Sequence, residues 1–149
     1  MQQDYGFLRE SPLFEALDDT AINRLVEVAQ IREFKPKEVV IQLGADGDSV
    51  FLLYDGSVSV STTGKFGEEI ALKTFNERGA FFGEVVLVDP GPRSATVTAE
   101  TAAVLLELTT EGFGIVFDEV ADAERVVLRN IARVLAQRLR NANELLAIR

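Results

Sequence analysis

The sequence predicts an α+β protein that is mainly β, with helices at both ends of the chain and short strands between them. Apolar residues follow a helical spacing near the start, alternate with polar residues in the middle, and return to a helical spacing at the end. Turn sequences rich in Gly and Asp separate the middle segments at close intervals. Several short strands divided in this way are typical of a β-sandwich or a β-barrel.

The composition fits one domain and narrows the chemistry. A chain of 149 residues with 47% hydrophobic and 26% charged residues is long enough for one core. Its net charge of −9 disfavours nucleic-acid binding by this stretch alone. It has no histidine for acid–base catalysis or zinc motifs, and no cysteine for thiolate metal sites or disulfides. We therefore expect no enzyme, no metal and no catalytic cofactor.

The cytoplasm is the expected location of the protein. No apolar run approaches the roughly 18 residues needed to span a bilayer, and the first residues lack the pattern of a secretory signal. The absence of cysteine suits a reducing compartment. On these grounds we expect no membrane contact.

Two helical segments are predicted before the strands. Ser11-Pro12 is a typical start of a short helix, because serine caps the helix and proline fits its first turn. A second helix is predicted from residue 19 to about residue 30. Its apolar face consists of Ile22, Leu25, Val26 and Ala29.

Six strands are predicted in the middle of the chain. Asp55-Gly56 is a strong hairpin signal, and Gly44-Ala45-Asp46-Gly47-Asp48 is a further turn. Val58 and Val60 alternate with serines, as in a strand with one wet face. The predicted strands are 39–41, 49–53, 57–62, 69–75, 93–99 and 103–109.

One long helix is predicted from about residue 118 to residue 148, where proline and glycine are absent. Before it, Gly112-Phe113-Gly114, which follows Thr109-Thr110-Glu111, is interpreted as a capped helical turn. The apolar stripe of the long helix consists of Leu128, Ile131, Leu135, Leu139, Ala142 and Leu145. This stripe can pack on the protein's own strands or form a dimer seam, and we expect a homodimer.

The arginines of this helix are interpreted as a solvated face, with a DNA-contacting surface as the open alternative. Acidic residues lie among them, which favours the solvated face. The arginines are Arg125, Arg129, Arg133, Arg138 and Arg140.

Residues 81 to 97 hold a candidate anion site. Gly83 lets the backbone approach a ligand closely, and the apolar segment 85–88 is too short for a stable isolated helix, so its first amides are free to meet an anion. Arg93 follows a rigid Pro-Gly-Pro loop, and its guanidinium suits a phosphate. A carboxylate such as Glu84 would repel a neighbouring anion, so its presence here indicates that it binds a hydroxyl group, such as that of a sugar. Together these residues indicate a site for a sugar phosphate.

This stretch closely resembles the phosphate-binding cassette of cyclic nucleotide-binding domains, a family that includes bacterial catabolite-activator regulators, kinase regulatory subunits and gated channels. The matching features are Phe82-Gly83-Glu84, the nine-residue step from Glu84 to Arg93, and Arg93-Ser94-Ala95-Thr96. Upstream, Ser11-Pro12-Leu13-Phe14, the turn at 44–48 and Asp55-Gly56-Ser57-Val58 fall at corresponding family positions. One departure is Lys37, where the family commonly has glycine.

The resemblance implies one cyclic nucleotide-binding domain over residues 1–149. Its expected parts are N-terminal helices at 1–33, an eight-stranded jelly-roll barrel at 34–109 and C-terminal helices at 110–149. The cassette, with a short helix of its own, would occupy residues 82–96 of the barrel.

The same resemblance implies roles for single residues. Glu84 would accept the ribose 2′-hydroxyl, and Arg93 would pair with the cyclic phosphate. The amides of Gly83, Val85, Ser94 and Ala95 would point at phosphate oxygens, and Phe82 and Thr96 complete this part of the ligand-binding set.

Two further positions bear on the base. Threonine is common at position 94 in cGMP-selective members, whereas serine occurs in some bacterial cAMP receptors, so Ser94 favours cAMP over cGMP. In the family the C-terminal helix often closes over the base, which makes Asn141 and Asn143 candidates to contact the adenine edge. The open alternative for these two is surface asparagines near a helix end.

We therefore expect a regulatory domain that binds a cyclic nucleotide and relays binding through its C-terminal helix to an effector. A DNA-binding domain, a channel and a signalling enzyme are all open as the effector. The helical pattern that reaches the end of the sequence favours a longer protein over a stand-alone sensor. The alternative function is a ligand-free barrel that acts as a dimerisation or interaction module.

Overall fold

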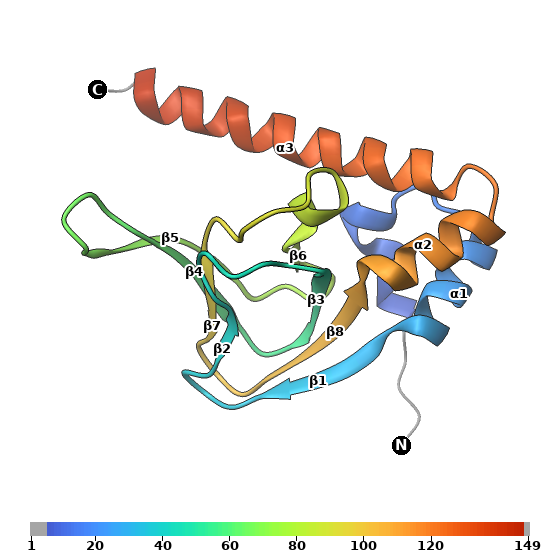
Figure 1. Ribbon diagram of the computed structural model, residues 1–149, viewed down its shortest axis with the longest axis horizontal. Helices are drawn as coiled ribbons and strands as arrows, with labels where there is room; N and C mark the ends of the chain where they lie inside the picture. Colours follow the sequence, from blue (N-terminus) through green and yellow to red (C-terminus); the bar gives the residue numbers. More distant parts are fainter. Residues whose placement is uncertain (1–5, 148–149) are drawn as a thin grey trace.

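In the computed structural model, which describes residues 6–147, the helices from both ends of the chain gather on one side of the strands (Figure 1). The chain begins with two short 3₁₀ helices, η1 (Gly6–Glu10) and η2 (Pro12–Phe14). Ser11 caps η2 as predicted, because its hydroxyl accepts a hydrogen bond from the Leu13 amide. The same hydroxyl donates to the carbonyl oxygen of Gly79, which ties the start of the chain to the strands.

The next helix, α1 (Asp19–Val28), is shorter than predicted. Helical spacing extends the predicted helix to about residue 30, but β1 (Gln30–Phe34) already begins there. Four of the five residues of β1 are exposed, so its sequence has no alternation of apolar and polar residues that would identify a strand. The hydrogen bonds of β1 to another strand decide its conformation.

The other strands follow the predicted order. They are β2 (Val39–Ile41), β3 (Ser49–Asp55), β4 (Val58–Thr63), β5 (Glu69–Phe75), β6 (Phe81–Phe82), β7 (Thr96–Ala99) and β8 (Ala103–Thr109). The two-residue strand β6 was not predicted, because it is too short to show a period. Strand β7 begins at Thr96 rather than at Arg93, since the backbone of Arg93 bonds with the loop at Gly44 and Ala45 instead.

The eight strands form two four-stranded antiparallel sheets in the orders β1-β8-β3-β6 and β2-β7-β4-β5. Within residues 6–147 the two sheets remain separate, so the expected eight-stranded barrel is not closed. Their inner faces meet in one apolar cluster. It includes Phe51, Leu53 and Leu105 from the first sheet and Ile41, Val58 and Val97 from the second.

The C-terminal region contains two helices where the long helix was expected to begin. Helix α2 (Thr110–Glu119) starts at the predicted cap, where the Thr109 hydroxyl accepts a hydrogen bond from the Gly112 amide. The chain then turns at Asp122, whose φ of 66° is left-handed, and α3 (Ala123–Ala147) follows. The predicted start near residue 118 is therefore wrong. No helix within residues 6–147 is long and apolar enough to cross a membrane.

A second apolar cluster joins the helices to the sheets. Phe14, Leu25, Phe113 and Ile131 are among its buried members, and they come from η2, α1, α2 and α3. The first half of α3 packs into this cluster, whereas every residue from Ala136 to Ala147 is exposed. Figure 1 shows the second half of α3 extending past the strands, roughly alongside the β4–β5 hairpin.

Candidate functional site

Arg93 is held by backbone groups of two segments of the chain. Its Nη1 donates to the carbonyl oxygen of Gly83 at 3.0 Å, and its Nη2 donates to that of Ser49 at 2.7 Å. The guanidinium also lies against Gly47, where an added Cβ would overlap it. These hydrogen bonds hold Arg93 in one orientation, and a group oriented by the protein itself loses less entropy on binding a ligand.

The charge of Arg93 is partly withdrawn from water. Burial lowers the pKa of Arg93, while the negative charges of Asp48, Glu107 and Glu84 act to raise it. An arginine guanidinium stays protonated in proteins, so the group presents a fixed positive charge. A phosphate is a suitable partner for such a partly desolvated cation.

Gly83 joins Arg93 to the cassette helix. Its φ of 81° is left-handed, and a Cβ at this position would lie 2.8 Å from Nη1 of Arg93. Only glycine satisfies both conditions without strain. The turn leads directly into the 3₁₀ helix η3 (Glu84–Leu87), which confirms a short, structurally supported helix after Gly83.

Glu84 is buried, with 1% of its surface exposed, and its partner is Arg138. A carboxylate oxygen of Glu84 accepts a hydrogen bond from Nη1 of Arg138, which α3 supplies. A carboxylate at this depth needs a partner of opposite charge, because an unpaired buried charge is strongly destabilising. The ion pair therefore connects the cassette to the C-terminal helix.

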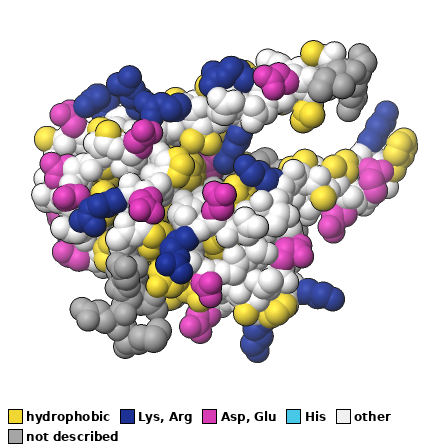
Figure 2. All heavy atoms as spheres, turned by 180° about the vertical axis from the view of Figure 1, so that it is seen from behind, with side chains coloured by type: hydrophobic (Ala, Val, Ile, Leu, Met, Phe, Trp, Pro, Cys, Tyr) yellow, Lys and Arg dark blue, Asp and Glu magenta, His cyan; other side chains and the backbone are white. Residues whose placement is uncertain are grey.

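Arg138 is a functional residue that sequence reasoning missed. It was grouped with four other arginines in a solvated face of the helix. At 100° per residue, Arg125, Arg129, Arg133 and Arg140 fall within about 80° of one another, while Arg138 points more than 120° away from that face. A helical projection of the five arginines would have separated Arg138 from the rest. Basic side chains gather along α3 in the space-filling view (Figure 2).

The remaining cassette residues fall into two groups. Phe82 is buried, and its ring stacks on Phe51 with centroids 5.8 Å apart, so its side chain belongs to the core. The Thr96 hydroxyl accepts a hydrogen bond from the Leu43 amide at 3.1 Å, which is a structural role. Val85 and Ser94 are exposed, whereas Ala95 is half-buried.

The two asparagines of α3 lie in different surroundings. Asn141 lines a cavity of about 550 Å³ together with Gln137 and Arg138, and its side-chain oxygen accepts a hydrogen bond from Gln137 at 3.0 Å. Asn143 is exposed and is not among the residues that line this cavity. The structure thus brings Asn141, but not Asn143, into one cavity with a residue that contacts Glu84.

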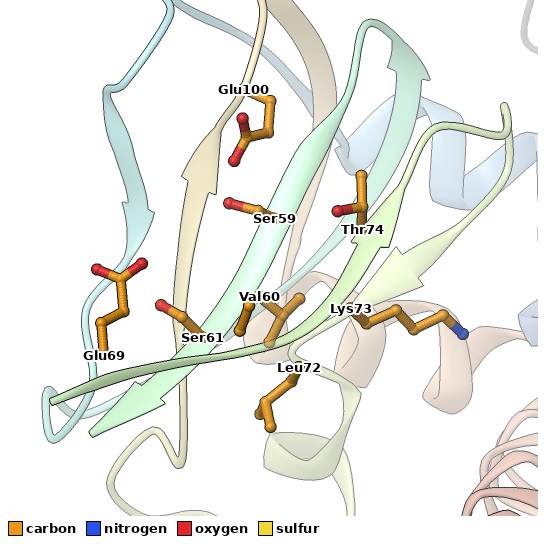
Figure 3. Close-up of a pocket in the computed structure, with 9 residues that line it drawn as sticks. Ser59, Val60, Ser61, Glu69, Leu72, Lys73, Thr74 and Glu100 are labelled. Atoms are coloured by element: carbon orange, nitrogen blue, oxygen red, sulfur yellow. The ribbon is translucent and has the colours of Figure 1, made fainter. Parts of the chain in front are cut away.

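A further pocket, of about 360 Å³, lies on strands β4 and β5 (Figure 3). Ser59, Ser61 and Glu69 line it together with Glu100. Its lining includes neither Glu84 nor Arg93, so it is separate from the cassette. Within residues 6–147 no group of three or more carboxylates is arranged to hold a metal ion.

The cassette thus brings together a fixed cation, a left-handed glycine turn and a buried carboxylate, groups that suit a small anion that also carries a hydroxyl. Residues 31–119 match the sequence model of the cyclic nucleotide-binding domain, and the chain belongs to this family.

Proteins of different kinds are similar to this chain in sequence. The chain is 34% identical to a cAMP-dependent protein kinase regulatory subunit of Yarrowia lipolytica, over 78% of this chain and 30% of that protein. It also resembles a cyclic nucleotide-gated potassium channel of Mesorhizobium japonicum, with 36% identity over 68% of this chain and 26% of the channel. The chain thus spans less than a third of either relative.

The fold of this chain is also similar to that of a protein of known structure. The catabolite activator protein of Thermus thermophilus matches with a TM-score of 0.80 and 30% identity, over 93% of this chain and 62% of that chain. The match covers the helices as well as the sheets, since it includes nearly all of this chain.

Proposed function

We propose that this chain is a cyclic nucleotide sensor that binds cAMP without converting it chemically. The observation that carries the proposal is that Arg93 and Glu84 meet at Gly83. Arg93 bonds to the carbonyl oxygen of Gly83, and Glu84 is the next residue along the chain. One turn therefore positions both a phosphate-binding cation and a hydroxyl-binding carboxylate.

The proposed binding mode assigns one part of the ligand to each group. The cyclic phosphate pairs with Arg93 and with the amides of the cassette, and the ribose 2′-hydroxyl donates to Glu84. Ser94 supports cAMP as the ligand, together with the kinase subunit of Yarrowia lipolytica, which is named as cAMP-dependent. The proposed location is the cytoplasm.

The proposed output is a change in α3. Arg138 of α3 forms an ion pair with Glu84, the carboxylate that would receive the ribose hydroxyl. A ligand that bonds to Glu84 changes the partners of Arg138, and so binds one arrangement of α3 better than another. Differential affinity of this kind is what couples a ligand to a conformational equilibrium.

The proposed partners are a second copy of this chain and an effector. The exposed second half of α3 carries Leu139, Leu145 and Leu146, which supports a helix-mediated homodimer. The matched proteins are named as a kinase regulatory subunit, a potassium channel and a catabolite activator, so the effector could belong to any of three classes.

Isothermal titration calorimetry with cAMP and cGMP tests this function. We expect saturable binding to the wild-type protein and a ten- to hundredfold loss of affinity in Arg93→Ala, because a charge-assisted hydrogen bond contributes about 1.5–3 kcal/mol. Arg93→Lys keeps the charge but loses the two-pronged geometry, so it should also bind more weakly. Circular dichroism of each variant controls for folding.

Wild-type affinity in a folded Arg93→Ala variant would contradict the assignment of the site. If neither nucleotide binds wild-type protein at millimolar concentration, the function is instead that of a ligand-free dimerisation or interaction module.

A further inference from the structure

A row of three side chains crosses the first sheet and ends at Arg93. Arg32 of β1, Glu107 of β8 and Ser49 of β3 come from strands that are neighbours in the sheet (Figure 1). Nη1 of Arg32 donates to one carboxylate oxygen of Glu107 at 2.7 Å, and the Ser49 hydroxyl donates to the other at 2.8 Å. The carbonyl oxygen of Ser49 accepts the hydrogen bond from Nη2 of Arg93. One carboxylate thus lies between two arginines, and a single residue separates it from the phosphate-binding one.

Glu107 and Ser49 lie on the face of the first sheet that meets the second sheet. Leu105 and Phe51 belong to the apolar cluster between the sheets, and each is two residues away from one member of this pair. Alternate residues of a strand share a face, so Glu107 and Ser49 point toward the same cluster. The side chain of Glu107 is 15% exposed and Ser49 is buried. The carboxylate is therefore partly withdrawn from water, where its charge acts more strongly on its neighbours than it would on the open surface.

The charge of Glu107 acts on Arg93. Burial lowers the pKa of Arg93, and Glu107 is among the carboxylates whose charge opposes this shift. A carboxylate that stabilises a cation in this way also repels an anion that binds to the same cation. Arg32 forms an ion pair with Glu107, and its positive charge offsets part of that repulsion.

We propose that Glu107 sets the affinity of the site for the cyclic phosphate, because its carboxylate repels the bound anion and Arg32 limits the repulsion. The inference rests on the proposed function, since it requires the phosphate to sit at Arg93. Glu107 is also a positioning residue: its bond to the Ser49 hydroxyl holds the residue whose carbonyl oxygen orients Arg93. The charge and the hydrogen bond can be separated, because glutamine accepts the same bond and is neutral.

Titration calorimetry with cAMP at low ionic strength tests the proposal in Glu107→Gln and Arg32→Met. We expect Glu107→Gln to bind cAMP about three- to tenfold more tightly, because the repelling charge is lost and the acceptor for Ser49 remains. Arg32→Met should bind cAMP about two- to threefold more weakly, because Glu107 then acts without its counter-charge. A purely structural row would weaken binding in both variants, since both substitutions disturb it.

Glu33→Gln is the matched control for net charge. Glu33 follows Arg32 on β1 and is exposed, and the alternation of the strand places it on the opposite face of the sheet. The substitution removes the same charge as Glu107→Gln, so an effect of overall charge would appear in both. We expect its affinity for cAMP to stay within about twofold of the wild type. Circular dichroism verifies that each variant is folded.

Weaker or unchanged cAMP binding by a folded Glu107→Gln variant would overturn the proposal. Tighter binding by Arg32→Met would overturn it as well, and so would equal tightening in Glu33→Gln. In all three cases the wild-type protein still binds cAMP, so the proposed function stands. A wild-type protein that binds no cyclic nucleotide would overturn the proposed function together with this inference.

Discussion

Arg93 shows how much of a binding site a single residue's surroundings determine. Its guanidinium bonds to the carbonyl oxygens of Gly83 and Ser49 and rests on Gly47, so two segments of the chain, 47–49 and the turn at Gly83, hold it. Both glycines lack the Cβ that would displace the guanidinium. The orientation of the cation is therefore set by backbone groups, which change little when a ligand binds.

Lys37 gives a prediction about stability at the scale of one residue. Its φ of 71° is left-handed, a conformation that costs an L-residue about 1–2 kcal/mol and costs glycine little. Lys37→Gly should therefore stabilise the protein by about 0.5 kcal/mol, after the greater backbone entropy of unfolded glycine is subtracted. Urea denaturation would measure the change.

Lys35→Gly is the control for this prediction. Lys35 lies in the same loop, and its φ is not left-handed. Glycine at this position should therefore only destabilise the protein. Destabilisation by Lys37→Gly of the same size as by Lys35→Gly would contradict the argument from φ.

At the scale of one element, α3 has two halves with different environments. Val127, Asn130 and Ile131 are buried in the first half, and no residue is buried from Ala136 to Ala147. The rest of the domain covers only part of the stripe predicted from Leu128 to Leu145. The stripe thus packs on the protein's own core at one end and leaves leucines exposed at the other.

Asn130 fastens the first half of α3 to the N-terminal segment. Its side-chain nitrogen donates to the carbonyl oxygens of Leu13 and Glu15, both at 2.9 Å. Asn130→Ala leaves the buried carbonyl of Leu13 and the partly buried carbonyl of Glu15 without this donor, so we expect a loss of about 1–3 kcal/mol in the free energy of unfolding. Chemical denaturation followed by circular dichroism would measure it.

Asn143→Ala serves as the comparison, because it gains the same helix propensity on the same helix at an exposed position. Its stability should stay within about 0.5 kcal/mol of the wild type. Equal stability of the two variants would show that Asn130 does not fasten α3.

At the scale of the whole molecule, the Glu84–Arg138 ion pair links the ligand site to the output helix. In Arg138→Met we expect faster amide hydrogen exchange, by at least several-fold, in the second half of α3, and a smaller effect of cAMP on that exchange. Arg140→Met is the matched control, since Arg140 bonds only to Gln137 on the exposed face. If the two variants exchange alike, the ion pair does not carry the signal.

The exposed leucines lead to a prediction about assembly. Leu139 and Leu146 are 62% and 61% exposed and are seven residues apart, the spacing of a coiled-coil seam. We expect a dimer in solution that Leu139→Glu combined with Leu146→Glu converts to a monomer, measured by analytical ultracentrifugation over a range of concentrations. Gln137→Glu adds charge about 160° around the helix from Leu139, on the opposite side from the leucines, and should leave the dimer intact. A wild-type protein that stays monomeric at high concentration would exclude this seam.

The sequence by itself determined the features that depend on neighbouring residues. The cap at Ser11, the turn at Asp55-Gly56, the order of six strands and the cassette from Phe82 to Thr96 all arise from local backbone preference or from a contiguous motif. Such patterns are visible because the interacting groups lie close together in the chain.

Tertiary structure decided what depends on contacts between distant segments. The separation of the strands into two sheets, the strand conformation of β1 and the helix break at Asp122 each depend on hydrogen bonds or packing that no local period encodes. The same holds for the site, where Arg138 meets Glu84 across 54 residues. Sequence spacing identifies residues that share a helix face or a strand, but only packing fixes which faces meet.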